Sequence, residues 1–272
     1  QRPSRSLPLP ADTRERRADR DMQLRRAQRG FSLVELAIAF TIVALLIGGA
    51  MMTLSAQIEQ RNSSETQRRL NAAVNAVIAF AIVNGRLPCP AVAGATGDEA
   101  FTGSNCTTWY GGFLPAKTIG FQPSDIAGYA VDTWGNRIRY VVSQSVTGCS
   151  GTVANPHFVS QANLKANGVS CRPSDIDICL SATGASATSC NSSANRAVTS
   201  DTVAFIVFST GKNGATASAY GTDELANVDG NPVFVSRTPS GPDSSAGTFD
   251  DLMVWVPAGV LYSKLISAGV LP

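Results

Sequence analysis

Residues Leu36–Ile58 form a run of 23 residues without a charged side chain. An α-helix rises about 1.5 Å per residue, so about 20 residues cross a hydrocarbon core about 30 Å thick. A run of this length can therefore span a membrane once. Arg25, Arg26 and Arg29 precede it, and the positive-inside rule keeps such a basic flank in the cytoplasm. The sequence thus predicts a single-pass protein whose body lies on the other side of the membrane.

The charges are divided unevenly along the chain. The 272 residues carry a formal net charge of +2, but the first 30 hold nine arginines against four acids, so the remainder is mildly acidic. Nucleic-acid binding needs a basic face to neutralise phosphates, and we therefore do not expect the body to bind DNA or RNA. The single histidine, His157, offers little for catalysis. We expect it at a turn or on the surface.

Six cysteines follow the apolar run, without a Cys-x-x-Cys pair or a histidine at the spacing of zinc ligands. An even number of cysteines beyond a membrane is typical of structural disulfides formed in an oxidising compartment. The sequence does not fix their pairing. Closeness along the chain suggests Cys89 with Cys106 and Cys171 with Cys179. The six are Cys89, Cys106, Cys149, Cys171, Cys179 and Cys190.

Glu35 immediately precedes the apolar run. A carboxylate near hydrocarbon costs several kcal/mol unless it reaches the headgroups, is protonated or meets a cation. Two interpretations are open. Glu35 is either a juxtamembrane acid that reaches toward the lipid headgroups or a residue kept for a partner cation.

Residues 29–36 read Arg-Gly-Phe-Ser-Leu-Val-Glu-Leu and lead into the apolar run. This segment resembles the class III signal of type IV prepilins and of the pseudopilins of type II secretion. In that family a membrane-embedded prepilin peptidase cuts after the glycine and methylates the new N-terminal residue, and the glutamate that follows serves assembly. The resemblance implies cleavage between Gly30 and Phe31, N-methylation of Phe31 and an assembly role for Glu35.

The resemblance makes residues 1–30 a leader that is removed. Met22 would begin a short basic leader, in which case residues 1–21 lie upstream of the true start. Two other interpretations of the apolar run remain, an uncleaved signal anchor and a secretory signal that is cut after Ala56. Both leave Glu35 unexplained.

The helical pattern continues beyond the apolar run. Apolar residues between 70 and 82 recur every three or four positions, which is typical of a helix with one buried face. Gly85 is a suitable C-cap, and Pro88 forbids continuation. We therefore expect one helix from about Leu33 to Asn84. Most major pilins have a proline in the first half of this helix, and its absence here favours a minor subunit.

Beyond residue 85 the chain changes to short β-like runs joined by segments rich in Gly, Ser, Thr and Asn. We expect an α+β, pilin-like fold in which the long helix, transmembrane in its first half, packs on an antiparallel sheet with disulfide-bearing loops. Residues 31–58 are then the transmembrane and assembly half of the helix, and 59–272 the periplasmic head. Residues 181–195 predict an exposed loop and 258–268 a closing helix. The expected strands are Arg137–Val142, Val203–Phe208 (a central strand), Pro232–Val235 and Leu252–Val256.

Two segments of the head resemble the major pseudopilin of type II secretion. Residues 132–140 are similar to its Asp-Pro-Trp-Gly turn and strand, with Thr133 at the usual proline. Residues 208–214 and 249–252 are similar to its glycine-rich turn and its acidic loop, which in that relative holds Ca²⁺. Carboxylates are ligands that Ca²⁺ prefers, so the resemblance implies a calcium site, against the alternative of a solvated acidic loop. Its candidate ligands are Asp223, Glu224, Asp229, Asp243, Asp250 and Asp251.

The resemblance implies a structural subunit, a minor pilin or pseudopilin, of a type IV pilus or a type II secretion pseudopilus. Such a subunit lies in the bacterial inner membrane, with its N-terminus in the cytoplasm and its head in the periplasm, until it is extracted into a filament. The implied partners are prepilin peptidase, other pilin or pseudopilin subunits, and an assembly platform with its cytoplasmic ATPase.

Two other functions stay open. A membrane-anchored envelope enzyme needs a nucleophile, a base and an oxyanion site, but the sequence has no Gly-x-Ser-x-Gly elbow, His-Glu-x-x-His motif or P-loop. We therefore expect no enzymatic activity. A filament-tip adhesin or DNA-uptake pilin would share the same N-terminal segment, so that segment does not exclude it.

Overall fold

The computed structural model describes residues 32–103, 105–144, 156–200 and 202–271, with the backbone alone at 49–54 and 217. The chain divides into two compact units between Gln57 and Ile58. We describe each unit by itself and call the second one, from Ile58 onward, the head. Gly30 and Phe31 lie outside the described residues.

Helix α2 runs from Leu33 to Asn84, the bounds that the sequence predicts. It begins at a capping box, because the backbone N–H of Glu35 donates to Ser32 Oγ at 3.1 Å while Glu35 Oε2 lies 3.5 Å from the backbone N of Ser32. Gly85 follows its last residue and caps it, because its φ of +67° lies in the left-handed region that glycine adopts readily.

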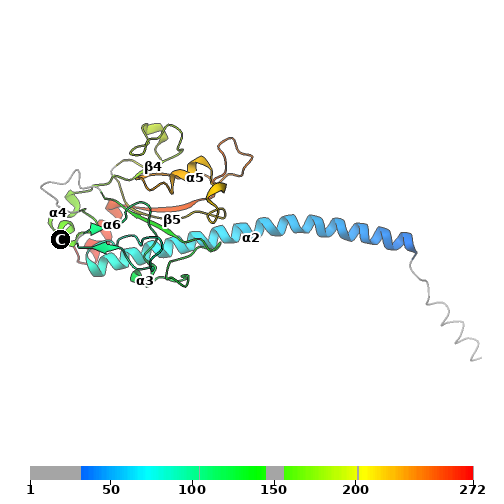
Figure 1. Ribbon diagram of the computed structural model, residues 1–272, viewed down its shortest axis with the longest axis horizontal. Helices are drawn as coiled ribbons and strands as arrows, with labels where there is room; N and C mark the ends of the chain where they lie inside the picture. Colours follow the sequence, from blue (N-terminus) through cyan, green and yellow to red (C-terminus); the bar gives the residue numbers. More distant parts are fainter. Residues whose placement is uncertain (1–31, 104, 145–155, 201, 272) are drawn as a thin grey trace, which may run out of the picture. The chain divides into compact units, whose positions relative to one another are not determined.

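The head is built on a three-stranded antiparallel sheet of order β3-β5-β7. Its strands are β3 (Arg139–Val142), β5 (Val203–Ser209) and β7 (Leu252–Pro257), which confirms three of the four expected strands (Figure 1). In the register of the sheet, Tyr140 pairs with Val207 and Ile206 with Trp255. Every residue of β5 is buried, so the central position predicted for it is confirmed.

Strand β5 is buried because both of its faces are covered. Phe205 and Val207 pack into one hydrophobic cluster with the apolar face of α2 and with α6 (Ala258–Ser267). Ile206 and Phe208 pack into a second cluster with Ile178 and other residues. The head therefore stacks the 58–84 part of α2, the three-stranded sheet and a second β layer.

That second layer corrects one expectation. Strand β6 (Val233–Val235) does not join the antiparallel sheet but pairs in parallel with β4 (Asp177–Cys179), a strand that the sequence analysis missed. A central strand that is apolar on both faces needs a second cover, and β4 with β6 provides it. The other elements are β1 (Phe101–Thr102), β2 (Asn105–Cys106), α3 (Ala116–Ile119), α4 (Gln161–Asn167), η2 (Gly168–Ser170), η3 (Ser193–Asn195), η4 (Ala217–Ala219) and α5 (Thr222–Ala226).

The disulfides confirm one suggested pair and correct the other. Cys89 is bonded to Cys106, as expected. Cys179 is bonded to Cys190 across 11 residues rather than to Cys171. Cys171 is also disulfide-bonded, and Cys149 lies outside the described residues. Distance along the chain failed as a guide because Cys179 is fixed in β4, beside the loop that returns Cys190 to it.

His157 begins a turn, closed by the hydrogen bond from the backbone N of Ser160 to its carbonyl at 3.3 Å, so the turn that we expected is confirmed and the surface position is wrong. Its side chain is fully buried, and its Nε2 lies 2.7 Å from the hydroxyl of Tyr262 on α6. Burial lowers the pKa of His157 to about 4, so the imidazole is neutral at physiological pH. The apolar residues Phe158 and Val159 that follow it are the sequence signal for burial that we overlooked.

Candidate functional site

The first unit presents a continuous apolar surface. Every residue of α2 from 33 to 48 is exposed, and Leu33, Phe40 and Leu45 have exposed fractions of 87%, 65% and 72%. Soluble monomeric proteins rarely expose so large an apolar surface, so lipid or other protein chains are expected to cover it.

Glu35 has a local role that the sequence analysis did not assign. Its contacts in the described chain are those of the capping box with Ser32, which satisfy backbone donors at the start of α2. The signal was present, since Ser-x-x-Glu before an apolar run is the sequence pattern of a capping box. The carboxylate is exposed and has no ion pair among the described residues.

Two head segments that resemble a pseudopilin lie against each other. Asp132 Oδ1 accepts hydrogen bonds from the backbone N–H groups of Trp134 and Asn136, at 2.9 and 2.8 Å. Its Oδ2 accepts from Ser209 Oγ at 2.6 Å, and Asn136 Nδ2 donates to the carbonyl of Gly211 at 2.6 Å. Burial raises the pKa of Asp132 and these hydrogen bonds oppose that shift. The turn before β3 is thereby fixed to the turn after β5.

Thr133, at the position where a proline is usual, fixes the same turn to α2. Its hydroxyl lies 2.7 Å from Thr66 Oγ1 and donates to the carbonyl of Asn62 at 3.0 Å. Arg69 Nη1 donates to the carbonyl of Asp132 at 2.9 Å. A proline has no hydroxyl, so the threonine supplies a contact that the usual residue cannot make.

Three of the six candidate calcium ligands converge. Glu224, Asp250 and Asp251 place carboxylate oxygens within 4.8 Å of one another, and we call these three residues the acidic cluster. Glu224 comes from α5, and the other two immediately precede β7. A Cβ atom at Gly211 would lie 2.0 Å from Asp250 Oδ1, and the φ of Gly211 is +64°. The close approach of Asp250 to this turn therefore requires glycine.

Several buried side-chain oxygens in and beside the acidic cluster lack a hydrogen-bond partner within the described chain. Asp250 Oδ1, Asp251 Oδ1 and the nearby Asn213 Oδ1 are buried and have no hydrogen-bond partner in the described chain. Burial, then the charge of Glu224, raises the pKa of Asp250 to about 6. Burial also raises the pKa of Asp251 to about 8, against the hydrogen bond from Asn227. Unsatisfied buried oxygens of this kind fit a hard cation such as Ca²⁺.

The other three candidates are not part of the cluster. Asp223 accepts from Arg237 Nε at 2.6 Å and from the backbone of Ala182, and Asp229 bonds to Asn231. Asp243 is exposed. We missed Asn213, whose amide donates to Glu224 Oε2 at 2.8 Å, because a search for acids passes over amide oxygens. Its place two residues after Gly211 was the available signal.

Comparison with known proteins identifies the N-terminal segment. The sequence profile of the prokaryotic N-terminal methylation motif matches residues 25–51. The chain carries a prepilin-type methylation motif. No curated protein and no solved structure matches the chain. Within the part of the chain that the structure describes, no helix is both long and apolar enough to cross a membrane.

The methylation motif marks a pilin- or pseudopilin-like substrate of prepilin peptidase. Gly30, Phe31 and Glu35, to which the resemblance assigns processing and assembly, all lie within the matched range. A long N-terminal helix followed by an α+β head with antiparallel strands and disulfides fits a pilin-like fold. The match ends at residue 51, before the head begins at Ile58. The chemistry of the head is therefore known from its geometry alone.

Proposed function

We propose that the chain is a structural subunit, a minor pilin or pseudopilin, of a type IV pilus or a type II secretion pseudopilus. The methylation motif at residues 25–51 carries this proposal. The exposed apolar surface of residues 33–48 supports it, because a subunit that moves from a membrane into a filament exchanges one apolar environment for another.

In this proposal the 23-residue uncharged run crosses the bacterial inner membrane once. The basic residues before it hold the leader in the cytoplasm, and the head with its disulfides lies in the periplasm. Prepilin peptidase cuts between Gly30 and Phe31 and methylates Phe31. An assembly platform with its cytoplasmic ATPase then extracts the subunit into the filament.

Glu35 acts in this assembly through its charge. An exposed carboxylate beside apolar residues needs a counter-cation once water is excluded around it. The N-terminal amine of Phe31 in a neighbouring subunit supplies that cation after cleavage. The pairing removes the cost of a buried charge only in one axial position, so it also sets the register of the helices.

The mature N-terminus is the first test. Intact mass and N-terminal sequencing of the protein from cells with and without prepilin peptidase are expected to show a peptidase-dependent start at N-methylated Phe31. A Gly30→Leu variant is expected to stay uncut, whereas Gly48→Leu, which changes a glycine beyond the cleavage position, is cut normally. An uncut wild-type chain, or a start after Ala56, contradicts the proposal.

Two substitutions separate the charge of Glu35 from its capping role. Glu35→Gln keeps an acceptor for the capping box but removes the charge, whereas Glu35→Ala removes both. We expect both variants to be cleaved and to be absent from sheared filaments. Asp243→Ala, a control at an exposed acid of the head, is expected to assemble normally. Normal incorporation of Glu35→Gln would show that Glu35 acts as a cap.

We also propose that the acidic cluster holds Ca²⁺. Glu224, Asp250 and Asp251 would supply carboxylate ligands, since their oxygens lie within 4.8 Å of one another. Asn213, whose amide donates to Glu224, would add its Oδ1, which like Asp250 Oδ1 and Asp251 Oδ1 has no hydrogen-bond partner in the described chain. Bound calcium would neutralise the carboxylates and fix α5 to the start of β7. This role is structural.

Calcium binding is measurable as a change in melting temperature. Calcium added to chelator-treated full-length protein is expected to raise the melting temperature by about 5 °C or more at concentrations far above Kd. Asp251→Asn should lose this response. Asp243→Asn, which changes an acid outside the cluster, should keep it. An unchanged melting temperature in the wild type rejects the calcium site.

A further inference from the structure

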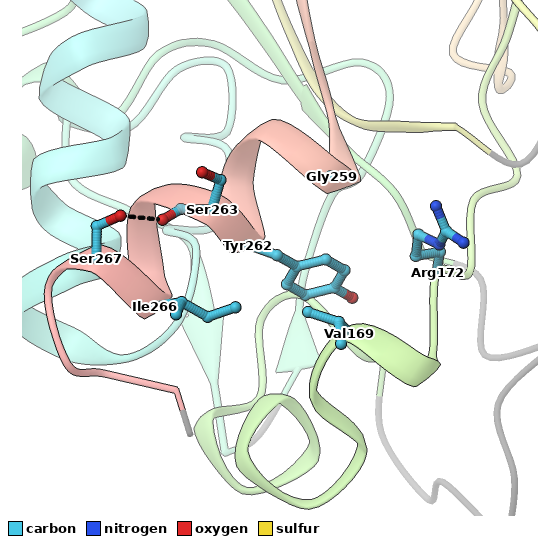
Figure 2. Close-up of a pocket in the computed structure, with 7 residues that line it drawn as sticks. All are labelled: Val169, Arg172, Gly259, Tyr262, Ser263, Ile266 and Ser267. Atoms are coloured by element: carbon cyan, nitrogen blue, oxygen red, sulfur yellow. Dashed lines mark hydrogen bonds between the residues drawn. The ribbon is translucent and has the colours of Figure 1, made fainter.

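A groove of about 500 Å³ lies between α6 and the η2 turn of the head (Figure 2). Val169 and Ile266 line it and have exposed fractions of 55% and 42%. The ring of Tyr262 projects between α6 and η2 toward the side of the groove where Arg172 lies (Figure 2). The groove thus combines an apolar lining with one cationic side chain at its edge.

The groove is preformed rather than flexible. Tyr262 is 2% exposed, and its hydroxyl bonds both to His157 Nε2 and to the backbone carbonyl of Cys171. Those bonds hold the ring in place and leave the hydroxyl no free donor. A surface that is already ordered loses little entropy when a partner binds. Among the residues that line the groove, the charged group available to a partner is the guanidinium of Arg172, beside the exposed residues Ser263 and Ser267.

The surroundings of the groove are basic in a head that is otherwise acidic. The segments 156–174 and 258–271 contain Lys165, Arg172 and Lys264 and no acidic residue. All three side chains are exposed, and none has an ion pair among the described residues. Elsewhere in the head most cations are paired, as Arg86 is with Glu99 at 2.8 Å. A partner for this surface must bring both apolar and acidic groups.

The same chain carries such a surface elsewhere. Leu225 on α5 has an exposed fraction of 48%, and the carboxylate of Asp229, in the turn after α5, is exposed without an ion pair in the described chain. We call residues 222–231 the α5 turn. It lies apart from α4 and α6 in the head (Figure 1). One chain therefore cannot place its own α5 turn in its own groove without refolding.

We propose that the groove receives the α5 turn of a second copy of this chain. Leu225 of one copy lies against Val169 and Ile266 of the other, and Asp229 lies beside Arg172. This inference rests on the proposed filament role and on more than one copy of this chain lying in a filament, where neighbouring subunits are held at high local concentration. Two different surfaces meet in this contact, so each copy keeps a groove or an α5 turn with which it can bind a further copy.

Site-specific photo-crosslinking tests the contact in full-length protein in cells. p-Benzoyl-phenylalanine at Val169 is expected to give crosslinked dimers of this chain, and mass spectrometry should place the link within residues 222–231. The same group at Asn75, an exposed position on α2, serves as the control and should not label that segment. Absence of dimers, or crosslinks to another polypeptide or to lipid, overturns the proposal.

A charge exchange tests the ionic part of the contact. Arg172→Glu and Asp229→Arg should each lower the yield of crosslinked dimer by about fivefold to tenfold, and the double variant should restore it. Arg61→Glu, at an exposed arginine of α2 without an ion pair in the described chain, should have no effect. Equal melting temperatures show that the variants fold. Loss in Arg172→Glu without restoration in the double variant contradicts the pairing.

The experiments can refute the proposed contact and the proposed filament role independently. A chain that is methylated at Phe31 and recovered in sheared filaments, but gives no crosslink from Val169 to residues 222–231, refutes the contact and leaves the role intact. A chain that gives this crosslink but is absent from filaments supports the contact and refutes the role.

Discussion

The two units differ in what holds them together. Residues 33–48 of α2 are all exposed, and their hydrogen bonds within the described chain are local ones, such as Thr41 Oγ1 to the carbonyl of Ala37. The head buries β5 completely and is crosslinked by disulfides. In proteins most of a helix's stability comes from packing of its apolar face against other groups. One helix, α2, therefore depends on its surroundings in its first half and on the head's own core in its second.

Under the proposed function, this difference would let one chain serve first in a membrane and then in a filament. The head carries its stability with it, because its core does not depend on a neighbour. Residues 33–48 of the first unit have no buried core of their own, so their stability depends on the lipid or protein that covers them. Substitutions in the two units should accordingly have different consequences.

The largest expected effect comes from the centre of the head. Phe205→Ala should lower the free energy of unfolding of the head by about 3–5 kcal/mol, because the ring is fully buried. It also packs against Tyr140, with ring centroids 5.9 Å apart. Phe40→Ala, at an exposed position of the first unit, should leave the melting temperature of the head unchanged. Thermal unfolding in detergent compares the two, and equal losses would contradict their independence.

The Cys179–Cys190 disulfide should have the next largest effect. Replacing both cysteines by serine should cost about 2–3 kcal/mol, because the bond closes a loop of 11 residues in the unfolded chain. The loss should appear in unfolding of the head and not in the helix content of the first unit. Thr188→Ala, at an exposed position within the same loop, is the control. A double variant as stable as the wild type would contradict this expectation.

The acidic cluster should make the head sensitive to pH when calcium is absent. The pKa of Asp251 rises from 3.8 to about 8 in the folded chain. The folded state therefore binds more protons than the unfolded state between these values, and stability falls as pH rises. We expect a loss of about 1–2 kcal/mol from pH 6.5 to 8, measured by urea unfolding in chelator.

Calcium or the Asp251→Asn substitution should flatten this pH dependence, and Asp243→Asn should not. The pH window avoids the opposite effect of His157, whose lowered pKa of about 4 makes stability fall with acidity below about pH 6.5. A head whose stability is constant from pH 6.5 to 8 in chelator would contradict the raised pKa of Asp251.

The smallest expected effect is at the start of the first unit. Ser32→Ala removes the N-cap and should destabilise the first turn of α2 by about 1 kcal/mol. Hydrogen exchange of the first two turns in detergent should become faster, whereas Ser32→Thr should preserve the cap. The melting temperature of the head should not change. A change there would show that the units are coupled.

The sequence predicted the elements with strong local signals. Gly85 and Pro88 locate the end of α2, and six consecutive apolar residues locate β5. Strand β4 was missed because it has three residues, one of them the buried acid Asp177, and pairs with a strand more than 50 residues away. Such pairing depends on the folded chain as a whole, so no local pattern reports it.

The candidate site residues also divide into those with a local sequence signal and those that only the folded chain brings together. The methylation motif is a continuous stretch, so the sequence alone detects it, and the roles of Gly30, Phe31 and Glu35 within it stay predictions. The acidic cluster is assembled from α5 and the segment before β7, and composition could not tell Glu224 from Asp223, its neighbour, which instead pairs with Arg237. Because successive residues on a short helix point in different directions, that choice is made only by packing.

The bonds between Asp132, Ser209, Asn136 and Gly211 bear on how such a head can evolve. They tie the ends of β3 and β5 together, so the frame of the sheet does not rely on the length of the segments that connect its strands. Insertions and deletions in the connecting segments outside the buried strands β4 and β6 can alter the outer surface while the frame persists. Selection can therefore change the surface that the head presents to its partners without changing the hydrogen bonds that hold the sheet together.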